Sequence, residues 1–212
     1  MPPSFIEADG VIAVVRLDDL SKAVPLTEAL VAGGVRAVEF TFTNPAAAGA
    51  ISAARDALGQ HALIGAGSVL DAETARIAIL AGAAFVVTPT VSLPTIEICN
   101  RYGVATTIGA LTPTEILTAW QAGATYVKVF PASLGGPRYL RDVHGPLPQV
   151  KLIPTGGVDL DNAGEFIRAG AVALALGGNL VDARSVANED WDTITTRARA
   201  LVAAVDRARH PP

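Results

Sequence analysis

Short apolar runs rich in valine and isoleucine alternate along the chain with longer stretches rich in alanine and leucine. Each run is apolar at nearly every position, which is typical of strands that are buried on both faces of a parallel sheet. The expected strands are Val11–Arg16, Ala37–Phe42, Ala62–Val69, Ala84–Pro89, Val104–Ile108, Tyr126–Pro131, Lys151–Thr155 and Ala171–Gly177.

The stretches between these runs carry signals for the start and end of helices. Asp71 is a good N-cap residue, and Thr112-Pro113-Thr114-Glu115 combines an N-cap threonine, a proline at the first helical position and a capping-box glutamate. Asp161-Asn162 is expected to open a further helix in a similar way. A glycine follows each helical stretch, where it can adopt the left-handed conformation that ends a helix. These glycines are Gly33, Gly59, Gly82, Gly103, Gly123, Gly145 and Gly170.

Eight strand–helix units in 212 residues suit the smallest form of a (β/α)₈ TIM barrel. A doubly wound open sheet has the same alternation and is the rival interpretation. The even spacing of the eight units favours closure, and no Gly-x-Gly-x-x-Gly motif follows the first strand. We therefore predict one catalytic (β/α)₈ barrel domain over residues 1–212.

Composition narrows the range of functions. The chain has 20 acidic and 16 basic residues, and half of its residues are hydrophobic. This balance argues against disorder, and it makes nucleic acid and anionic membrane poor candidate partners. A single cysteine and three widely spaced histidines make a structural metal site unexpected. With no signal-peptide pattern and no apolar run long enough to cross a bilayer, we expect a cytoplasmic protein.

Three charged residues stand in or at the end of expected strands: Arg16, Glu39 and Lys128. A buried lysine has a lowered pKa, and its neutral amine can attack a ketone or aldehyde to form a Schiff base. A carboxylate in a barrel mouth, such as Glu39, can act as a general base. The alternatives are a buried Lys–Glu pair, a lysine whose charged end reaches solvent, or a glutamate that only neutralises Lys128 or Arg16.

Glycine-rich segments end the last two strands: Pro154-Thr155-Gly156-Gly157 and Leu176-Gly177-Gly178-Asn179. The loops after strands seven and eight of such barrels commonly bind phosphate, because glycine lets backbone N–H groups approach the anion. Gly65-Ala66-Gly67-Ser68 is a similar segment after the third strand, and it could be a substrate contact or a tight turn. The pattern therefore predicts a phosphorylated ligand.

In order along the chain, several of these motifs resemble the 2-keto-3-deoxy-6-phosphogluconate (KDPG) aldolase family. These class I aldolases include enzymes for 2-keto-4-hydroxyglutarate (KHG) and 2-keto-3-deoxy-6-phosphogalactonate. The resemblance extends from about Ile12 to Leu180. It rests on Ala32-Gly33-Gly34-Val35-Arg36-Ala37-Val38-Glu39, Ile64-Gly65-Ala66-Gly67-Ser68-Val69-Leu70, Val127-Lys128-Val129-Phe130-Pro131-Ala132, Pro154-Thr155-Gly156-Gly157-Val158 and Gly177-Gly178.

The resemblance implies Lys128 as the Schiff-base lysine and Glu39 as the proton-shuttling glutamate. Ser68 stands where the family usually has a threonine near the keto acid. The full set expected to bind substrate is Arg16, Thr43, Ser68, Pro89, Phe130 and Thr155, and the set expected to bind phosphate is Gly156, Gly157, Gly178 and Asn179. The family also implies a homotrimer with no metal and no cofactor.

Some positions depart from the family pattern. Thr43 stands where many members have an arginine that pairs with the keto acid carboxylate, so we expect Arg16 to make that contact instead. Asn179 replaces a phosphate-loop serine, Ile108-Gly109 replaces a usual Pro-Gly, and Gly135-Gly136-Pro137 resembles the galactonate-type loop. These departures leave the identity of the sugar acid open.

The resemblance implies cleavage of a 2-keto-3-deoxy-6-phospho sugar acid, of the KDPG type, to pyruvate and D-glyceraldehyde 3-phosphate. The expected partners are the phosphorylated keto acid and pyruvate, with no nucleic acid and no membrane. Galactonate-type and hydroxyglutarate-type substrates are the close alternatives. A phosphosugar isomerase or epimerase and a non-catalytic phosphometabolite-binding barrel are alternatives of a different class, and neither needs a buried amine that forms an imine.

Overall fold

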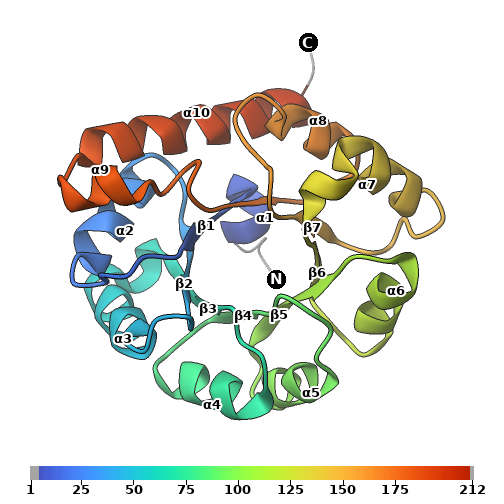
Figure 1. The fold of residues 1–212 in the computed structure, drawn as a ribbon, viewed down its shortest axis with the longest axis horizontal. Coiled ribbons are helices and arrows are strands. Elements are labelled where there is room, and N and C mark those ends of the chain that lie inside the picture. Colours follow the sequence, from blue (N-terminus) through green and yellow to red (C-terminus); the bar gives the residue numbers. More distant parts are fainter. Residues whose placement is uncertain (1–4, 211–212) are drawn as a thin grey trace.

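The computed structural model describes residues 5–210, which fold as a single (β/α)₈ barrel (Figure 1). Eight parallel strands form one sheet in the order β7-β6-β5-β4-β3-β2-β1-β8. Isolated bridges from Leu152 to Ala171 and from Thr155 to Ala175 bring β7 beside β8 and close the sheet. The strands are β1 (Val11–Val15), β2 (Ala37–Thr41), β3 (Leu63–Gly67), β4 (Phe85–Val87), β5 (Ala105–Ala110), β6 (Tyr126–Val129), β7 (Leu152–Pro154) and β8 (Leu174–Leu176).

Helices surround the strands as an outer ring, and the long α10 lies along α2 and α8 (Figure 1). Gly33 allows α2 and α10 to approach closely, because a Cβ on Gly33 would lie 2.5 Å from the Cβ of Ala198. The helices are α1 (Phe5–Asp9), α2 (Ala23–Ala32), α3 (Ala47–Leu58), α4 (Ala72–Leu80), α5 (Leu93–Arg101), α6 (Pro113–Gln121), α7 (Gly136–His144), α8 (Ala163–Arg168), α9 (Ala183–Ala187) and α10 (Trp191–Arg209), with 3₁₀ turns at Gly59–His61 and Ala132–Leu134.

All three expected helix starts are confirmed, and two of them have the expected side-chain cap. The Asp71 carboxylate accepts a hydrogen bond from the Thr74 backbone N–H at 2.7 Å. Thr112 and Glu115 form the complete capping box. At α8 the helix begins at Ala163 as expected, but Asn162 makes no side-chain cap for it. Its side chain instead closes a turn with Asp159, in which each side chain accepts a 3.0 Å bond from the other residue's backbone N–H.

The glycines that end the helices adopt positive φ at most of the expected positions, for example +95° at Gly82 and +105° at Gly170. The prediction is wrong at Gly33 and Gly145, where φ is −85° and −52°. After α2 the positive φ falls one residue later, on Gly34 at +93°.

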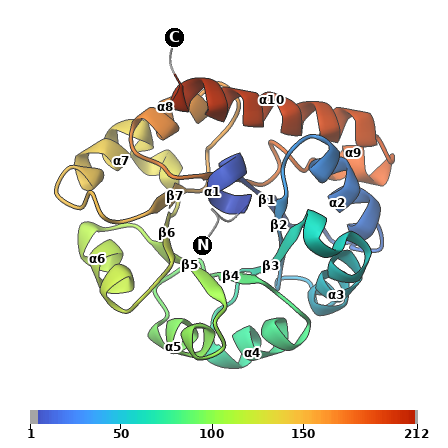
Figure 2. The same ribbon diagram turned by 180° about the vertical axis from the view of Figure 1, so that it is seen from behind.

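The buried apolar residues form two layers, one between the sheet and the helices and one inside the barrel. The inner layer includes Ile12, Phe85 and Ile153. The short helix α1 lies across one end of the barrel, seen from behind in Figure 2, and its Ile6 packs into this inner layer. Glu7 of α1 accepts hydrogen bonds from Tyr126 Oη at 2.9 Å and from Lys151 Nζ at 2.8 Å. The amino-terminal end of the barrel is therefore closed.

Candidate active site

The charged residues singled out from the sequence lie toward the carboxyl end of the barrel. Glu39 and Lys128 are within β2 and β6, and Arg16 directly follows β1. Several expected strands end earlier than the apolar pattern indicates, so that Phe42, Pro89 and Thr155 lie just past strand ends; β5, in contrast, continues to Ala110. These residues therefore belong to the mouth of the barrel, where enzymes of this fold carry out their chemistry.

Lys128 is buried, with 5% of its surface exposed. Its Nζ lies 4.8 Å from the centre of the Phe130 ring, and it makes no hydrogen bond or ion pair with the residues that the structure describes. Burial lowers the pKa of the amine; the negative charge of Glu39 partly opposes this, and the positive charge of Arg16 adds to it. The alternative of a lysine that reaches solvent is wrong. Burial thus enlarges the neutral fraction of the amine, which is the form that nucleophilic attack requires.

Glu39 is also buried, with 1% of its surface exposed. Burial raises the pKa of its carboxyl, while the positive charges of Lys128 and Arg16 lower it. A Cβ on Gly67 would lie 2.6 Å from Glu39 Oε1, so this glycine makes room for the carboxylate. Glu39 and Lys128 influence each other through their charges without an ion pair within 4.0 Å. A buried carboxyl with a raised pKa beside a cation is the kind of group that can take up and give back a proton.

Arg16 reaches across the mouth from β1 to the loop after β3, where its Nη2 donates to Ser68 Oγ at 3.2 Å. Arg16 and Thr43 line one cavity of about 470 Å³, together with Leu17, Asp18, Asn44 and Pro45. Thr43 is exposed, and its hydroxyl lies 2.9 Å from that of Thr41. Because the guanidinium is exposed at this opening, it can still pair with an incoming carboxylate.

The two glycine-rich loops lie together. Gly157 has a φ of +76°, and a Cβ at this position would lie 2.6 Å from the Cβ of Ser133. Asn179, after β8, donates from Nδ2 to the Val158 carbonyl at 2.8 Å, which joins the loops after β7 and β8. Gly156 has a φ of +86°, whereas a Cβ on Gly178 would meet no atom within 4 Å. These loops have the glycine-lined form that suits an anion, and Asn179 has one amide hydrogen left to donate.

The remaining expected substrate contacts lie around Lys128. Phe130 is next to the amine, and a Cβ on Gly156 would lie 3.4 Å from its ring. Pro89 is half-buried beside Gly109, and Thr155 is buried with a hydroxyl that has no hydrogen-bond partner among the described residues. Sequence reasoning assigned no role to Thr107, whose buried hydroxyl is likewise unpartnered. The signal that could have indicated it is the Thr106-Thr107 pair in an otherwise apolar strand.

A family model described as KDPG and KHG aldolase matches residues 4–197. The chain belongs to this aldolase family. It is 39% identical over 202 residues to a 2-dehydro-3-deoxy-phosphogluconate aldolase of Treponema pallidum (strain Nichols), a match that covers 94% of this chain and 95% of the relative.

Two solved structures extend the comparison of this aldolase with its relatives. A structure titled as native KDPGal superposes with a TM-score of 0.87 at 32% identity, covering 94% of this chain and 95% of the other. A KDPG aldolase from Legionella pneumophila superposes with a TM-score of 0.86 at 29% identity, covering 93% and 96%. The latter structure holds pyruvate captured at low pH as a covalent carbinolamine intermediate.

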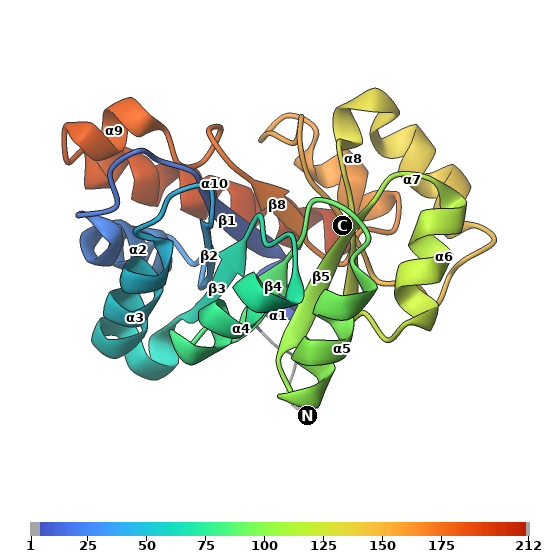
Figure 3. The ribbon, with the colours of Figure 1, turned by 60° about the horizontal axis from the view of Figure 1, so that its bottom comes forward.

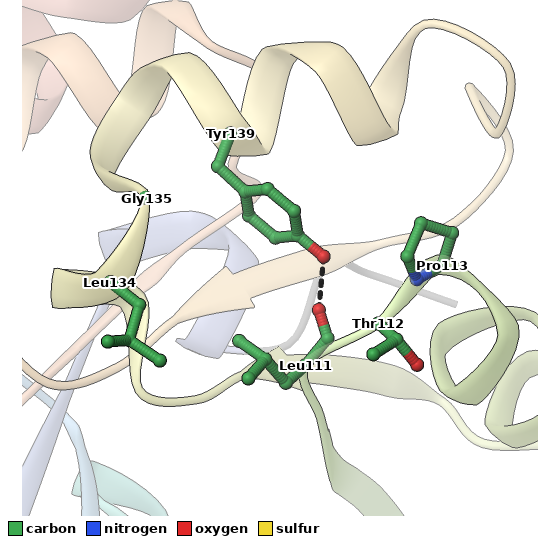
Figure 4. Close-up of a pocket in the computed structure, with 6 residues that line it drawn as sticks. All are labelled: Leu111, Thr112, Pro113, Leu134, Gly135 and Tyr139. Carbon is green, nitrogen blue, oxygen red and sulfur yellow. Dashed lines mark hydrogen bonds between the residues drawn. The ribbon is translucent and has the colours of Figure 1, made fainter.

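The aldolase has a second cleft, of about 290 Å³, between the loop after β5 and the start of α7 (Figure 4). Tyr139 of α7 donates from its hydroxyl to the Leu111 carbonyl across this cleft. Its walls are mostly apolar and contain none of the residues expected to act on substrate; they are Leu111, Thr112, Pro113, Leu134, Gly135 and Tyr139. The residues expected to bind or act on substrate therefore all lie outside this cleft.

Residues 5–210 of the aldolase, the described part of the chain, offer little for other kinds of site. Among them, no three His, Cys, Asp or Glu side chains are grouped as metal ligands would be. No helix in the same range is long and apolar enough to cross a membrane. Burial raises the pKa of the Cys99 thiol to about 11, so this cysteine stays protonated. Lys128, in contrast, is a buried amine whose pKa burial lowers.

Proposed function

We propose that this aldolase cleaves a 2-keto-3-deoxy-6-phospho sugar acid of the KDPG type to pyruvate and D-glyceraldehyde 3-phosphate through a Schiff base on Lys128. The observation that carries the proposal is a buried amine at the carboxyl end of the barrel, whose pKa burial lowers. Its charge interacts with that of one buried carboxyl, Glu39. An isomerase, an epimerase or a simple binding protein has no need to keep an amine in this state.

The steps follow from these two groups. The neutral Lys128 amine attacks the C2 carbonyl, and the carbinolamine hydroxyl leaves as water after Glu39 gives it a proton. The resulting iminium ion accepts the electron pair of the C3–C4 bond as that bond breaks. Glu39 takes the proton of the C4 hydroxyl, and the aldehyde departs. The enamine is then protonated at C3, and water adds to the iminium ion to release pyruvate and free the amine.

Substrate orientation follows from the groups that surround the amine. Arg16 is proposed to pair with the keto acid carboxylate, next to Ser68 and Thr43. Thr155 and Phe130 are proposed to flank the reacting carbon, and Pro89 is proposed to bound the site on the side of β4. The phosphate is proposed to lie on the loops after β7 and β8, against backbone N–H groups of Gly156, Gly157, Gly178 and Asn179.

Borohydride trapping tests this function. The protein is incubated with pyruvate and reduced, and the adduct is located by peptide mass mapping. We expect an adduct on Lys128 that is lost in Lys128→Arg. Lys151→Arg is the matched control, because Lys151 pairs with Glu7 at the closed end of the barrel and should not affect trapping. A folded protein that forms no adduct would refute the Schiff-base proposal.

The same protein then discriminates the substrates. Initial rates are compared for the gluconate-type and galactonate-type phosphorylated acids, which differ in configuration at C4 and release the same aldehyde, and for 2-keto-4-hydroxyglutarate, which releases a different one. We expect the highest kcat/KM with the gluconate-type acid. A galactonate-type preference would agree with the similarity to the KDPGal structure and with Gly135-Gly136-Pro137, which resembles the galactonate-type loop. A preference for 2-keto-4-hydroxyglutarate, which carries no phosphate, would argue against a phosphate-binding role for the loops after β7 and β8.

We also propose that the aldolase is a cytoplasmic homotrimer. Three exposed leucine and isoleucine side chains support self-association: Leu70, Ile77 and Leu80, with 65%, 53% and 67% of their surfaces exposed. They lie on α4 or just before it, where α4 and α5 run side by side on the outside of the barrel (Figure 3). Sedimentation equilibrium should give three times the chain mass, and Leu80→Glu should lower it. A wild-type monomer would contradict the assembly.

The cytoplasmic location is supported by the single cysteine, because a buried free thiol suits a reducing compartment.

A further inference from the structure

Three buried side-chain oxygens in residues 5–210 have no hydrogen-bond partner: Glu39 Oε2, Thr107 Oγ1 and Thr155 Oγ1. An unpaired buried polar atom costs free energy, and such atoms are nearly always paired with protein or with ordered water. Glu39 and Thr155 have places in the proposed reaction. Thr107, which has 1% of its surface exposed, has none so far.

Thr107 faces the inside of the barrel. Along β5 its neighbour Ile108 packs in the layer under the helices, and Ala105 packs against the inner layer. Because side chains alternate along a strand, Thr107 points inward with Ala105 and Gly109. The adjacent strand is β6, where Gly109 pairs with Lys128 and Thr107 pairs with Tyr126.

This register makes Thr107 the polar side chain of β5 that lies nearest to Lys128 on its amino-terminal side. Gly109, directly opposite Lys128, has no side chain, and Ile153, opposite on β7, is apolar. Tyr126 directs its hydroxyl to Glu7 at the closed end. The charged groups that face the amine are Glu39 from β2 and Arg16 after β1. Thr107 is therefore the last inward-facing residue of β5 before the Gly109–Lys128 pair, toward the closed end.

We propose that Thr107 is a positioning residue that orients the Lys128 amine through one buried water between them. This proposal rests on the proposed role of Lys128 as the imine-forming nucleophile. The water forms a hydrogen bond with the Thr107 hydroxyl, and it accepts a hydrogen bond from an N–H of the amine on the side of the closed end. The lone pair of the neutral amine then points to the open mouth, where the carbonyl carbon arrives.

Thr107→Val tests the proposal because it keeps the shape of the side chain and removes the hydroxyl. Thr107→Ser keeps the hydroxyl and should retain the wild-type behaviour. The readout is the rate of borohydride-trapped imine formation with pyruvate as a function of pH. For Thr107→Val we expect a plateau about five- to tenfold lower, the effect of one lost net hydrogen bond, with the KM for pyruvate unchanged. The half-plateau pH should fall as well, because the ammonium loses a hydrogen-bond acceptor.

Thr106→Val is the matched control on the same strand. The Thr106 hydroxyl accepts a hydrogen bond from the Thr125 backbone N–H at 3.1 Å, so its loss should weaken the fold and leave the pH profile unchanged. The proposal is overturned if Thr107→Val retains the wild-type profile, or if Thr106→Val shifts the profile equally.

A crystal structure separates failure of this proposal from failure of the proposed function. We expect an ordered water within hydrogen-bond distance of both Thr107 Oγ1 and Lys128 Nζ, and its loss in Thr107→Val. A wild-type enzyme that forms no imine but holds this water refutes the Schiff-base function alone. A wild-type enzyme that forms the imine and holds no such water refutes the role of Thr107 alone.

Discussion

The charges of Glu39 and Lys128 should stabilise each other only when both are present, which makes their interaction depend on pH. Burial raises the pKa of Glu39 above 4.5, so between that pH and its folded pKa the folded state holds a proton that the unfolded state has lost. Stability therefore falls as pH rises through this window. Burial lowers the pKa of Lys128 below 10.5, so between its folded pKa and 10.5 the unfolded state holds the extra proton and stability rises with pH.

The size of the interaction has an upper limit set by geometry. Two unit charges 4 Å apart attract by about 4 kcal/mol at an effective dielectric constant of about 20. Since Glu39 and Lys128 form no ion pair within 4.0 Å, their coupling must be smaller. We expect about 1–3 kcal/mol when both groups are charged. When Glu39 is protonated, the coupling should approach zero.

A double-mutant cycle measures this coupling. Wild type, Lys128→Met, Glu39→Gln and the double variant are unfolded in urea at one protein concentration, at about pH 5 and about pH 8. Lys128→Met keeps the apolar stem, so the cycle reports charge and not lost packing. We expect the larger coupling at the higher pH. A coupling below about 0.5 kcal/mol at the higher pH, or an equal coupling at both, would refute the reasoning.

Three further variants separate the parts of the site. Arg16→Ala should raise the KM for pyruvate about tenfold or more, the cost of one hydrogen bond to a charged group, and should leave kcat nearly constant; an unchanged KM would contradict the carboxylate contact. Gly157→Ala places a Cβ 2.6 Å from that of Ser133, so it should weaken cleavage of the phosphorylated substrate while pyruvate trapping persists. Loss of both activities would argue against a separate phosphate loop. Thr112→Ala breaks the capping box with Glu115 and should lower the free energy of unfolding by about 0.5–2 kcal/mol without affecting trapping; a change in trapping would argue against a purely structural role.

The sequence predicted the barrel and its two central charges because the strands are otherwise so uniformly apolar. Against that background a lysine in β6 and a glutamate in β2 are visible without any structure. The ends of the strands were predicted less well. Arg16, Phe42 and Phe130 lie past the assigned strand ends, because the apolar character continues into segments that line the mouth. The backbone N–H groups of Phe42 and Phe130 still donate to the carbonyls of Gly67 and Ala110 on the neighbouring strands. Periodicity reports burial, and it does not report where strand pairing stops.

Other features of the site could not be predicted because they depend on contacts between strands. The sequence did not decide whether the segment around Gly67 is a substrate contact or a tight turn. In the structure, the closeness of Glu39 Oε1 explains why a glycine stands there. The sequence marked Thr107 only through the Thr106-Thr107 pair, a weak signal because β-branched residues are common in any buried strand. Its unpaired hydroxyl became visible once the register placed it beside β6. Asn162 likewise looked like a helix cap until the fold paired it with Asp159.

The distribution of polar groups inside the barrel shows how the fold tolerates a costly site. Toward the closed end the interior is apolar, with Ile12 and Phe85 packed beneath the seal that Ile6 of α1 provides. The unpaired oxygens belong to Glu39, Thr107 and Thr155. These residues lie nearer the mouth, within β2 and β5 and just past the end of β7. Each of these groups costs stability unless water or substrate pairs with it, so the free energy that holds the barrel must come from the apolar end and from the layer under the helices. Substitutions that remove these unpaired oxygens, or that give them hydrogen-bond partners, should therefore stabilise the fold while they weaken the chemistry.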